Sequence, residues 1–325
     1  MPVSIAVTAA SKSNAADSFV LTLIGAPLGD ADLHAVAAVL EAGGWRQLEE
    51  RRLSLPGVTR GCVEWRLSGD DHSAAGLRER LRQLASERQL DIALQPDELQ
   101  RCHRRLIVFD MDSTLVEAEV IDELARVAGS WERVSAITER AMRGELEFAD
   151  SFRERLATLR GLPETCLPDI ADGLRVSPGA AALVATLGAA GYRSAIVSGG
   201  FEFFARRLAM QLGIDEVFAN TLDIADGAVT GEVHGHIIDG RRKAELLQEI
   251  AANQGISTAQ VIAVGDGAND LPMLGLAGLG VAYRAKPVVR DAAAQAITYS
   301  GLDSILFLLG IPEWHWCPAV TRSDI

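Results

Sequence analysis

The sequence predicts an α/β protein of two units, in which a doubly wound, Rossmann-like parallel sheet follows a small ferredoxin-like α+β domain. The length is the first observation, because 325 residues exceed the roughly 250–300 at which one core stops growing. The others are a β-α-β-β-α-β order before residue 96 and an alternation of strands and helices after residue 104. We expect domains over residues 17–96 and 104–312, between a flexible start at 1–16 and a tail at 313–325.

Hydrophobic periodicity places the elements of the first domain. Alternating and apolar runs predict strands, helical spacing predicts two helices, and Gly43-Gly44 is typical of a helix end. The expected elements, in order, are strand Ser18–Ile24, helix Ala31–Ala42, strands Trp45–Ser54 and Cys62–Leu67, helix Ala74–Arg88 and strand Asp91–Leu94.

The second domain contains strands that are apolar at almost every residue, as parallel strands covered on both faces are. These are Leu106–Phe109, Tyr192–Val197 and Val261–Val264. Residues from about 115 to 176 predict a helical cap inserted after the first of these strands, with helices Glu119–Ala128, Glu132–Arg143, Phe148–Leu159 and Pro163–Leu174. Phe218–Val233, centred on Asp226-Gly227, predicts a hairpin.

Composition excludes several classes of protein. The net charge of -13 and the lack of a basic stripe argue against a nucleic-acid partner. No apolar run reaches the roughly 18 residues of a membrane span and the start lacks a signal-peptide layout, so we expect no membrane partner and a cytoplasmic location. The four cysteines are scattered, which suggests neither a disulfide framework nor a zinc site.

Two acids, Asp110 and Asp112, come directly after the strand Leu106–Phe109. They share one side if strand geometry continues, and two close carboxylates are costly unless a cation holds them or one is protonated. The simpler alternative is a turn in which they cap the next helix together with Ser113 and Thr114.

Three further segments carry similar chemistry. Asp266 and Asp270 follow the strand Val261–Val264, and Ser198-Gly199-Gly200 ends another strand with a hydroxyl and exposed amides suited to phosphate oxygens. Lys243 lies at the start of a predicted helix. Taken singly, these segments also fit a tight turn and a solvated lysine.

Together the segments suggest phosphate-ester chemistry. Converging carboxylates favour a hard cation such as Mg²⁺, which with Lys243 would cancel charge on a phosphoryl group. Asp110 could then attack phosphorus, while Asp112 protonates the departing alkoxide and later activates water.

The motifs Asp110-Met111-Asp112-Ser113-Thr114, Ser198-Gly199-Gly200, Lys243 and Gly265-Asp266-Gly267-Ala268-Asn269-Asp270 resemble those of the aspartate-dependent phosphatases of the haloacid dehalogenase superfamily. The resemblance covers residues from about 104 to 312 and is closest to members that act on phosphoserine. It implies Mg²⁺-dependent hydrolysis of O-phospho-L-serine to L-serine and phosphate through an aspartyl phosphate, the last step of serine biosynthesis.

The resemblance also implies residue roles. Asp110 would be the nucleophile and Asp112 the general acid and base. Mg²⁺ would be held by Asp110, the main-chain carbonyl of Asp112 and Asp266, with Asp270 in support. Ser198 and Lys243 would bind phosphate. Gly199 and Asn269 would bind the substrate nearby, and Gly200 would support the site. Glu119 would bind the substrate ammonium and Arg155 its carboxylate, with Met142 close by; the alternative for this pair is an ordinary ion pair on a helix surface.

The element order of the first domain resembles that of ACT-type domains, which implies dimerisation or binding of L-serine as an effector. Three alternative functions remain open. One is a phosphatase or phosphotransferase for another small phosphoester, the second is a receiver-type signalling module, and the third is an amino-acid sensor that has no activity. Competent residues at each catalytic position and an acid for the leaving group favour an enzyme.

Overall fold

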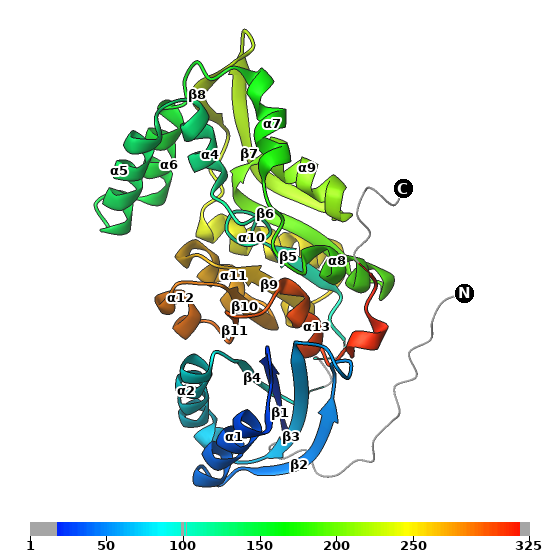
Figure 1. Cartoon of the computed structure of the whole chain (residues 1–325). Coiled ribbons are helices and arrows are strands. Elements are labelled where there is room, and N and C mark those ends of the chain that lie inside the picture. Colours follow the sequence, from blue (N-terminus) through cyan, green and yellow to red (C-terminus); the bar gives the residue numbers. More distant parts are fainter. Residues whose placement is uncertain (1–17, 99–100, 102, 319–325) are drawn as a thin grey trace.

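The computed structural model describes residues 18–98, 101 and 103–318, and within them the chain forms two units, each built on its own sheet (Figure 1). This confirms the predicted fold class. The flexible start expected at 1–16 and the last part of the expected tail, 319–325, lie outside the described residues. In the part of the chain that is described, no helix is long and apolar enough to cross a membrane.

The first unit is a four-stranded antiparallel sheet in the order β2-β3-β1-β4. Helices α1 and α2 pack on it through a core that includes Leu21, Leu40 and Leu77. Its elements are β1 (Ser18–Gly25), α1 (Asp30–Ala42), β2 (Arg46–Arg52), β3 (Gly61–Ser68), α2 (Asp71–Arg88) and β4 (Asp91–Pro96). All six predicted elements are present, and the strand order is that of a split βαβ fold.

The second unit is a seven-stranded sheet in the order β11-β10-β9-β5-β6-β7-β8. Only β8 is antiparallel to its neighbour. Its strands are β5 (Leu106–Phe109), β6 (Arg193–Phe201), β7 (Glu216–Ala225), β8 (Ala228–His234), β9 (Val261–Gly265), β10 (Leu279–Tyr283) and β11 (Gln295–Ile297). The chain leaves β5 toward β6 and later returns to β9 on its other side, so β5 lies at the topological switch where ligands of such sheets bind.

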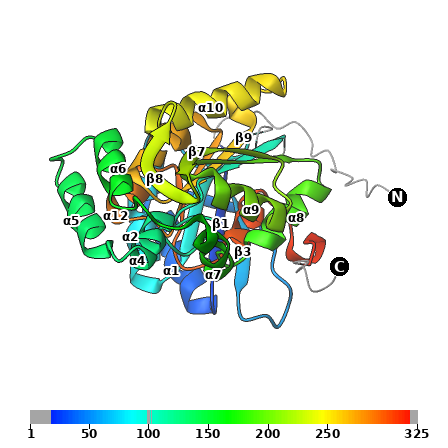
Figure 2. The ribbon, with the colours of Figure 1, turned by 90° about the horizontal axis from the view of Figure 1, so that it is seen from above.

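The residues of β5 alternate between two hydrophobic cores. Ile107 and Phe109 belong to the core under α8 (Ala180–Ala189) and α9 (Glu202–Leu212). Leu106 and Val108 belong to the core under α10 (Gly240–Asn253) and α11 (Leu271–Leu276). Figure 2 shows α10 on one side of the sheet and α8 and α9 on the other. Burial on both faces explains why the strand reads as a continuous apolar run.

The inserted cap consists of α4 (Val120–Val127), α5 (Trp131–Met142), α6 (Phe148–Ala157), η1 (Glu164–Cys166) and α7 (Leu167–Gly173). The prediction of a helix over Pro163–Leu174 is confirmed from Glu164 to Gly173, but its first turn, η1, is a 3₁₀ turn that runs directly into α7. Pro168 lies in the first turn of α7, where its missing N–H is tolerated. The predicted hairpin is β7–β8, and positive φ angles at Asp226 and Gly227 form its turn.

Short helices complete the second unit and connect it to the first. They are η2 (Thr258–Gln260), η3 (Ala268–Asp270), α12 (Pro287–Ala292), η4 (Leu302–Ser304), α13 (Ile305–Leu308) and η5 (Glu313–His315). At the junction, the buried Asp91 carboxylate of β4 accepts hydrogen bonds from the backbone N–H groups of Thr298, Tyr299 and Ser300. Arg60 pairs with Asp303 at 2.7 Å. The two units therefore share polar contacts, one set of them through the buried Asp91.

Candidate active site

Asp110 lies one residue beyond β5 and continues the ladder, since its N–H donates to the Val264 carbonyl at 2.9 Å. Its side chain is buried, and Oδ1 accepts from the Met111 N–H at 2.8 Å and from Lys243 Nζ at 2.7 Å. Among the described residues, Oδ2 has no hydrogen-bond donor. One oxygen is thus held by protein, and the other is available to a ligand.

Lys243 is 0% exposed, and its ammonium lies between two carboxylates, 2.7 Å from Asp110 and 2.7 Å from Asp270. Asp239 caps the helix through the Arg242 N–H, which places Lys243 in the first turn of α10, facing inward. Burial alone would lower the pKa of Lys243, but the two carboxylates raise it above its ordinary value. The alternative of a solvated lysine is wrong, because both partners come from distant loops that close over it.

Asp270 organises the loop after β9. Its Oδ2 accepts from the N–H groups of Asp266 and Gly267 at 3.1 and 2.9 Å, while its Oδ1 faces Lys243. A side chain on Gly265 would clash with the Asp270 carboxyl group, so glycine is required for this close approach. These contacts direct Asp266 toward Asp110.

Asp110, Asp266 and Asp270 each offer an oxygen, and these oxygens lie within 4.8 Å of one another. Burial, then the neighbouring Asp270, raises the pKa of Asp110 to about 8. Burial, then Asp270 and Glu119, raises the pKa of Asp266 to about 7. Lys243 reaches Asp110 and Asp270, whereas in the described part of the chain Asp266 has no cationic partner. An all-oxygen donor set with surplus negative charge fits a hard divalent cation such as Mg²⁺.

Asp112 lies in the same loop after β5 as Asp110 and contacts the cap. Its Oδ1 accepts from the Val120 N–H at 3.0 Å, which joins it to the first turn of the cap helix α4. Burial is the main cause of its raised pKa, followed by the charges of Glu119 and Asp110. A carboxyl group with a raised pKa can carry a proton near neutral pH and give it to a leaving group.

Asp112 does accept from the first N–H of α4, but Ser113 and Thr114 do not cap a helix as the simpler alternative required. Ser113 adopts a φ of 56° and donates to Glu119 Oε1 at 2.7 Å. Thr114 is buried and donates to Asp266 Oδ1 at 3.0 Å. The loop after β5 is therefore tied to both the cap and the loop after β9.

Ser198, Gly199 and Gly200 lie within β6 instead of following it, which corrects the predicted strand end at Val197. The pairing with β7 is interrupted between Val197 and Phe201, so these residues form an irregular segment that turns toward Asp112. Ser198 is buried, and its Oγ accepts from the Gly200 N–H at 2.9 Å, which leaves its hydroxyl hydrogen free to donate. A Cβ on Gly200 would clash with Asp112 Oδ2.

Asn220 on β7 supports this segment and was missed by the sequence analysis. Its Nδ2 donates to the Gly199 carbonyl at 2.8 Å, and its Oδ1 accepts from the Ile238 N–H at 2.9 Å. The side chain is buried and bridges two loops. The available signal was an asparagine directly after the apolar run Val217–Ala219.

The expected contacts for an amino-acid substrate lie at the cap side. Glu119 precedes α4 and contacts Ser113, and Arg155 on α6 is half-buried with its Nε 3.4 Å from the Ser151 carbonyl. Burial lowers the pKa of Arg155, while the charges of Glu119, Asp122 and Asp112 oppose that shift. Among the described residues, Glu119 and Arg155 make no ion pair with each other, so the alternative of a helix-surface pair is wrong.

Two other expected residues lie further out. Asn269 is half-buried on η3, and its backbone carbonyl packs so closely on Gly240 that a Cβ there would lie 2.6 Å away. Met142 ends α5 with 66% of its surface exposed, and its sulfur lies 3.9 Å from Lys286 Nζ. The structure therefore places Met142 at the outer junction of cap and core.

Comparison with known proteins agrees with this arrangement. Residues 107–275 match the model of the haloacid dehalogenase-like hydrolase family. The chain is similar to a phosphoserine phosphatase of Archaeoglobus fulgidus, with 47% identity over 77% of the chain and 73% of the relative. A phosphoserine phosphatase of Streptomyces coelicolor is 43% identical over 94% of the chain and 73% of its own length. Among solved structures, a probable phosphoserine phosphatase from Vibrio cholerae aligns with a TM-score of 0.72 and 34% identity, over 91% of this chain and 88% of that one.

Proposed function

The chain belongs to the haloacid dehalogenase-like hydrolases, and on this premise we propose that it is a phosphatase that hydrolyses O-phospho-L-serine to L-serine and phosphate. The observation that carries the proposal is the buried ammonium of Lys243 held between Asp110 and Asp270, beside the Ser198 hydroxyl segment. A positive charge and a free hydroxyl donor next to a buried carboxylate suit a phosphoryl group that is attacked by that carboxylate.

Asp110 is the proposed nucleophile. Its Oδ1 is fixed by Lys243 and the Met111 N–H, so the carboxylate is oriented before the substrate arrives. Its attack forms a bond to phosphorus and breaks the bond from phosphorus to the serine oxygen. The product of this step is an aspartyl phosphate on Asp110 and a departing serine.

Asp112 is the proposed general acid and base. Its raised pKa allows it to hold a proton, which it gives to the serine oxygen as the ester bond breaks. The resulting carboxylate then takes a proton from a water molecule that attacks the aspartyl phosphate. This second step releases phosphate and restores Asp110.

The phosphoryl oxygens would be bound by the Ser198 hydroxyl, the N–H groups around Gly199 and Gly200, Lys243 and Asn269. The Ser198 hydroxyl is directed by the Gly200 N–H, and Asn220 holds the Gly199 carbonyl away from the oxygens it would repel. Preformed donors of this kind stabilise charge in the transition state without reorganisation.

Mg²⁺ is the proposed cofactor, held by the carboxylates of Asp110 and Asp266 and the main-chain carbonyl of Asp112, with Asp270 in support. When bound, it neutralises phosphoryl charge as a Lewis acid. The protein's part is to gather these oxygens and to orient Asp266 through Thr114.

Glu119 and Arg155 are proposed to bind the amino-acid part of the substrate. They interact electrostatically without forming an ion pair, which leaves an anion for the substrate ammonium and a guanidinium for its carboxylate. Met142 would act only at the edge of the cap.

The test is phosphate release from L-phosphoserine, phosphothreonine and p-nitrophenyl phosphate, with Mg²⁺ and with EDTA. We expect metal-dependent turnover that is fastest on phosphoserine and absent in Asp110→Asn. Glu119→Gln should raise KM for phosphoserine far more than for an ester without an amino group. Turnover of the generic ester alone would refute the substrate assignment, and full activity of Asp110→Asn would refute the mechanism.

The role of the first unit is a separate part of the proposal, in which it mediates a homodimer or binds L-serine. Strand β2 is the open edge of its sheet and is exposed throughout, so a second copy could reach it. A monomer in light scattering, together with no heat of L-serine binding in calorimetry, would refute both roles.

A further inference from the structure

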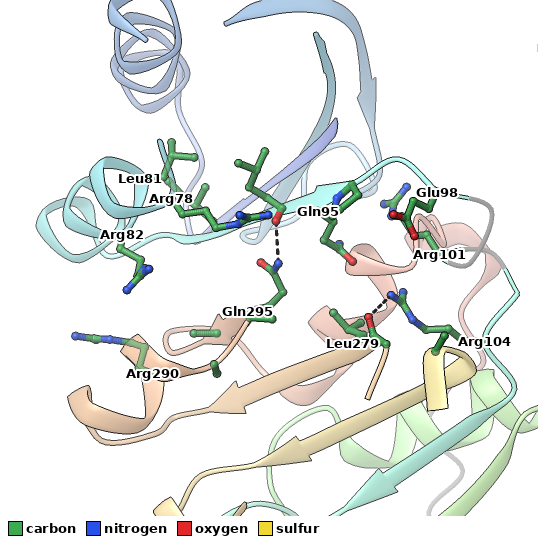
Figure 3. Close-up of a pocket in the computed structure, with 18 residues that line it drawn as sticks. Arg78, Leu81, Arg82, Gln95, Glu98, Arg101, Arg104, Leu279, Arg290 and Gln295 are labelled. Atoms are coloured by element: carbon green, nitrogen blue, oxygen red, sulfur yellow. Dashed lines mark hydrogen bonds between the residues drawn. The ribbon is translucent and has the colours of Figure 1, made fainter. Parts of the chain in front are cut away.

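A pocket of about 400 Å³ lies between the two units, where β4 and α2 of the first unit face β10, α12 and β11 of the second (Figure 3). Its walls are joined across the junction by hydrogen bonds. Gln295 Nε2 donates to the Leu94 carbonyl at 2.8 Å, and Gln95 Nε2 donates to the Leu308 carbonyl at 3.0 Å. The pocket is thus framed by fixed contacts.

This pocket is remote from the proposed catalytic centre. Arg104 precedes β5 and Gly278 precedes β10, so the pocket opens at the amino ends of the parallel strands. Asp110 and Asp266 follow β5 and β9 at the carboxyl ends. The sheet itself separates the two places, and a ligand in one cannot contact the residues of the other.

Five arginines line the pocket, and Glu98 is the one acid among its lining residues. They come from both units and from the segment between them: Arg78, Arg82, Arg101, Arg104 and Arg290. In a chain with a net charge of -13, this gathering of guanidinium groups runs against the overall charge.

The arginines differ in the ion pairs that they form within the protein. Arg101 is paired with the buried Glu64, and Arg82 and Arg290 share Asp291 at 4.0 and 3.9 Å. These three therefore have carboxylate partners in the protein.

Arg104 donates from Nη2 to the Gly278 carbonyl at 2.8 Å. Arg78 has more to offer a ligand. Arg78 is half-buried and forms no ion pair with any described residue. Figure 3 shows its side chain extending from α2 along the pocket wall toward Gln95, with Arg82 and Arg290 toward one end and Arg104 toward the other.

We propose that this pocket binds a small organic or inorganic polyanion that carries at least two phosphate or carboxylate groups. Guanidinium forks bind either group with paired hydrogen bonds, and their spread along the pocket suits a molecule with separated charges better than a monoanion. Gln95 Oε1 is buried without a hydrogen-bond donor, so a hydroxyl group on the ligand would satisfy it. This binding goes beyond the proposed function, and it would bridge the two units.

The test is titration calorimetry of the full chain with pyrophosphate, citrate and chloride at matched ionic strength. The protein is first freed of metal on a chelating resin, because a soluble chelator is itself a polyanion. We expect one saturable site for pyrophosphate or citrate and none for chloride. A response to pyrophosphate alone identifies a phosphate ligand, and a response to citrate alone identifies a carboxylate ligand.

Variants of the lining arginines test whether the polyanion binds in this pocket. Arg78→Gln and Arg290→Gln should each weaken binding at least tenfold, which is about 1.4 kcal/mol. The control Arg160→Gln, which removes an exposed cation paired with Glu232, should bind as the unmodified chain does. Melting temperatures check that each variant folds, and glutamine is a good helix former at position 78.

Three results would overturn the proposal: no saturable binding of either polyanion, unchanged binding in both arginine variants, or loss of binding in Ser198→Ala. Phosphoserine hydrolysis by Arg78→Gln without a polyanion should match that of the unmodified chain. Because binding is measured without metal or substrate, failure of this site and failure of the proposed function give different readouts.

Discussion

Replacing Lys243 with methionine removes the one cation among the described residues that faces both Asp110 and Asp270, each at 2.7 Å. Methionine keeps most of the buried volume, so the main change is electrostatic. We expect the metal-free Lys243→Met variant to be clearly less stable than the unmodified chain, and to lose more stability at high pH than at low pH.

The magnitude follows from burial. Lys243 is 0% exposed, and removing one partner of a buried ion pair costs about 3–5 kcal/mol. The pKa of Asp110 is already raised to about 8 with the lysine present, and without it the pKa rises further. A raised pKa in the folded state means that stability is present at low pH and is lost as the pH rises through that value. Because Asp110 titrates only near pH 8 in the unmodified chain, both chains lose stability alike up to about pH 7, and between pH 7 and pH 9.5 we expect the loss caused by the substitution to grow by about 1–3 kcal/mol.

The assay is urea denaturation of metal-free protein, followed by far-UV circular dichroism at pH 7 and pH 9.5. Lys286→Met is the matched control, because this lysine is exposed at the start of α12, and its loss should change stability by less than about 1 kcal/mol. Adding Asp270→Asn to Lys243→Met should recover part of the loss. A loss that is small, or that is equal at the two pH values, would show that the ammonium does not compensate the carboxylates.

Three more changes test the site. Gly200→Ala places a Cβ against Asp112 Oδ2, so kcat for phosphoserine should fall at least about tenfold with a smaller change in KM. The control Gly188→Ala should keep full activity, because nothing lies near the added atom. Asn220→Ala leaves two buried backbone groups without partners, and a drop of about 1–3 kcal/mol in unfolding free energy is expected from denaturation; no drop would remove its supporting role. Asp266→Asn removes a carboxyl group whose pKa is raised to about 7, and such a group costs stability as the pH rises. Without metal, the variant should therefore raise the melting temperature more at pH 8 than at pH 5. It should also abolish the stabilisation by Mg²⁺. Equal shifts at both pH values, or retained stabilisation by Mg²⁺, would contradict that account.

Much of the fold could be predicted because its signals are local. The run Leu106–Phe109 is apolar on both faces, and the observed strand has these bounds because two cores cover it. Acidic and glycine-rich turns after such strands predicted where the candidate site lies, since the carboxyl ends of parallel strands meet at one edge. The change from a 3₁₀ turn to an α-helix at Leu167 was not predicted, although Pro168 in the first turn of α7 marks a usual place for a helix to start.

What the sequence could not settle depends on contacts between distant segments. The burial of Lys243 depends on Asp110 and on Asp270, neither of which is near it in the chain. Asn220 supports the Gly199 segment from a neighbouring strand, and no spacing rule connects the two. The arginine pocket joins residues from both units, so it exists only after the units have packed.

The Asp91 contact has a consequence for protein engineering. A fragment cut to begin near residue 104 would leave three backbone N–H groups, at Thr298, Tyr299 and Ser300, without their carboxylate acceptor. It would also uncover Phe307, which is fully buried beside Ile24 and Cys62 of the first unit. A minimal catalytic fragment therefore needs a polar residue in place of Phe307 and a new hydrogen-bond acceptor for the loop 298–300. Truncation alone would leave an exposed apolar patch and unsatisfied backbone N–H groups.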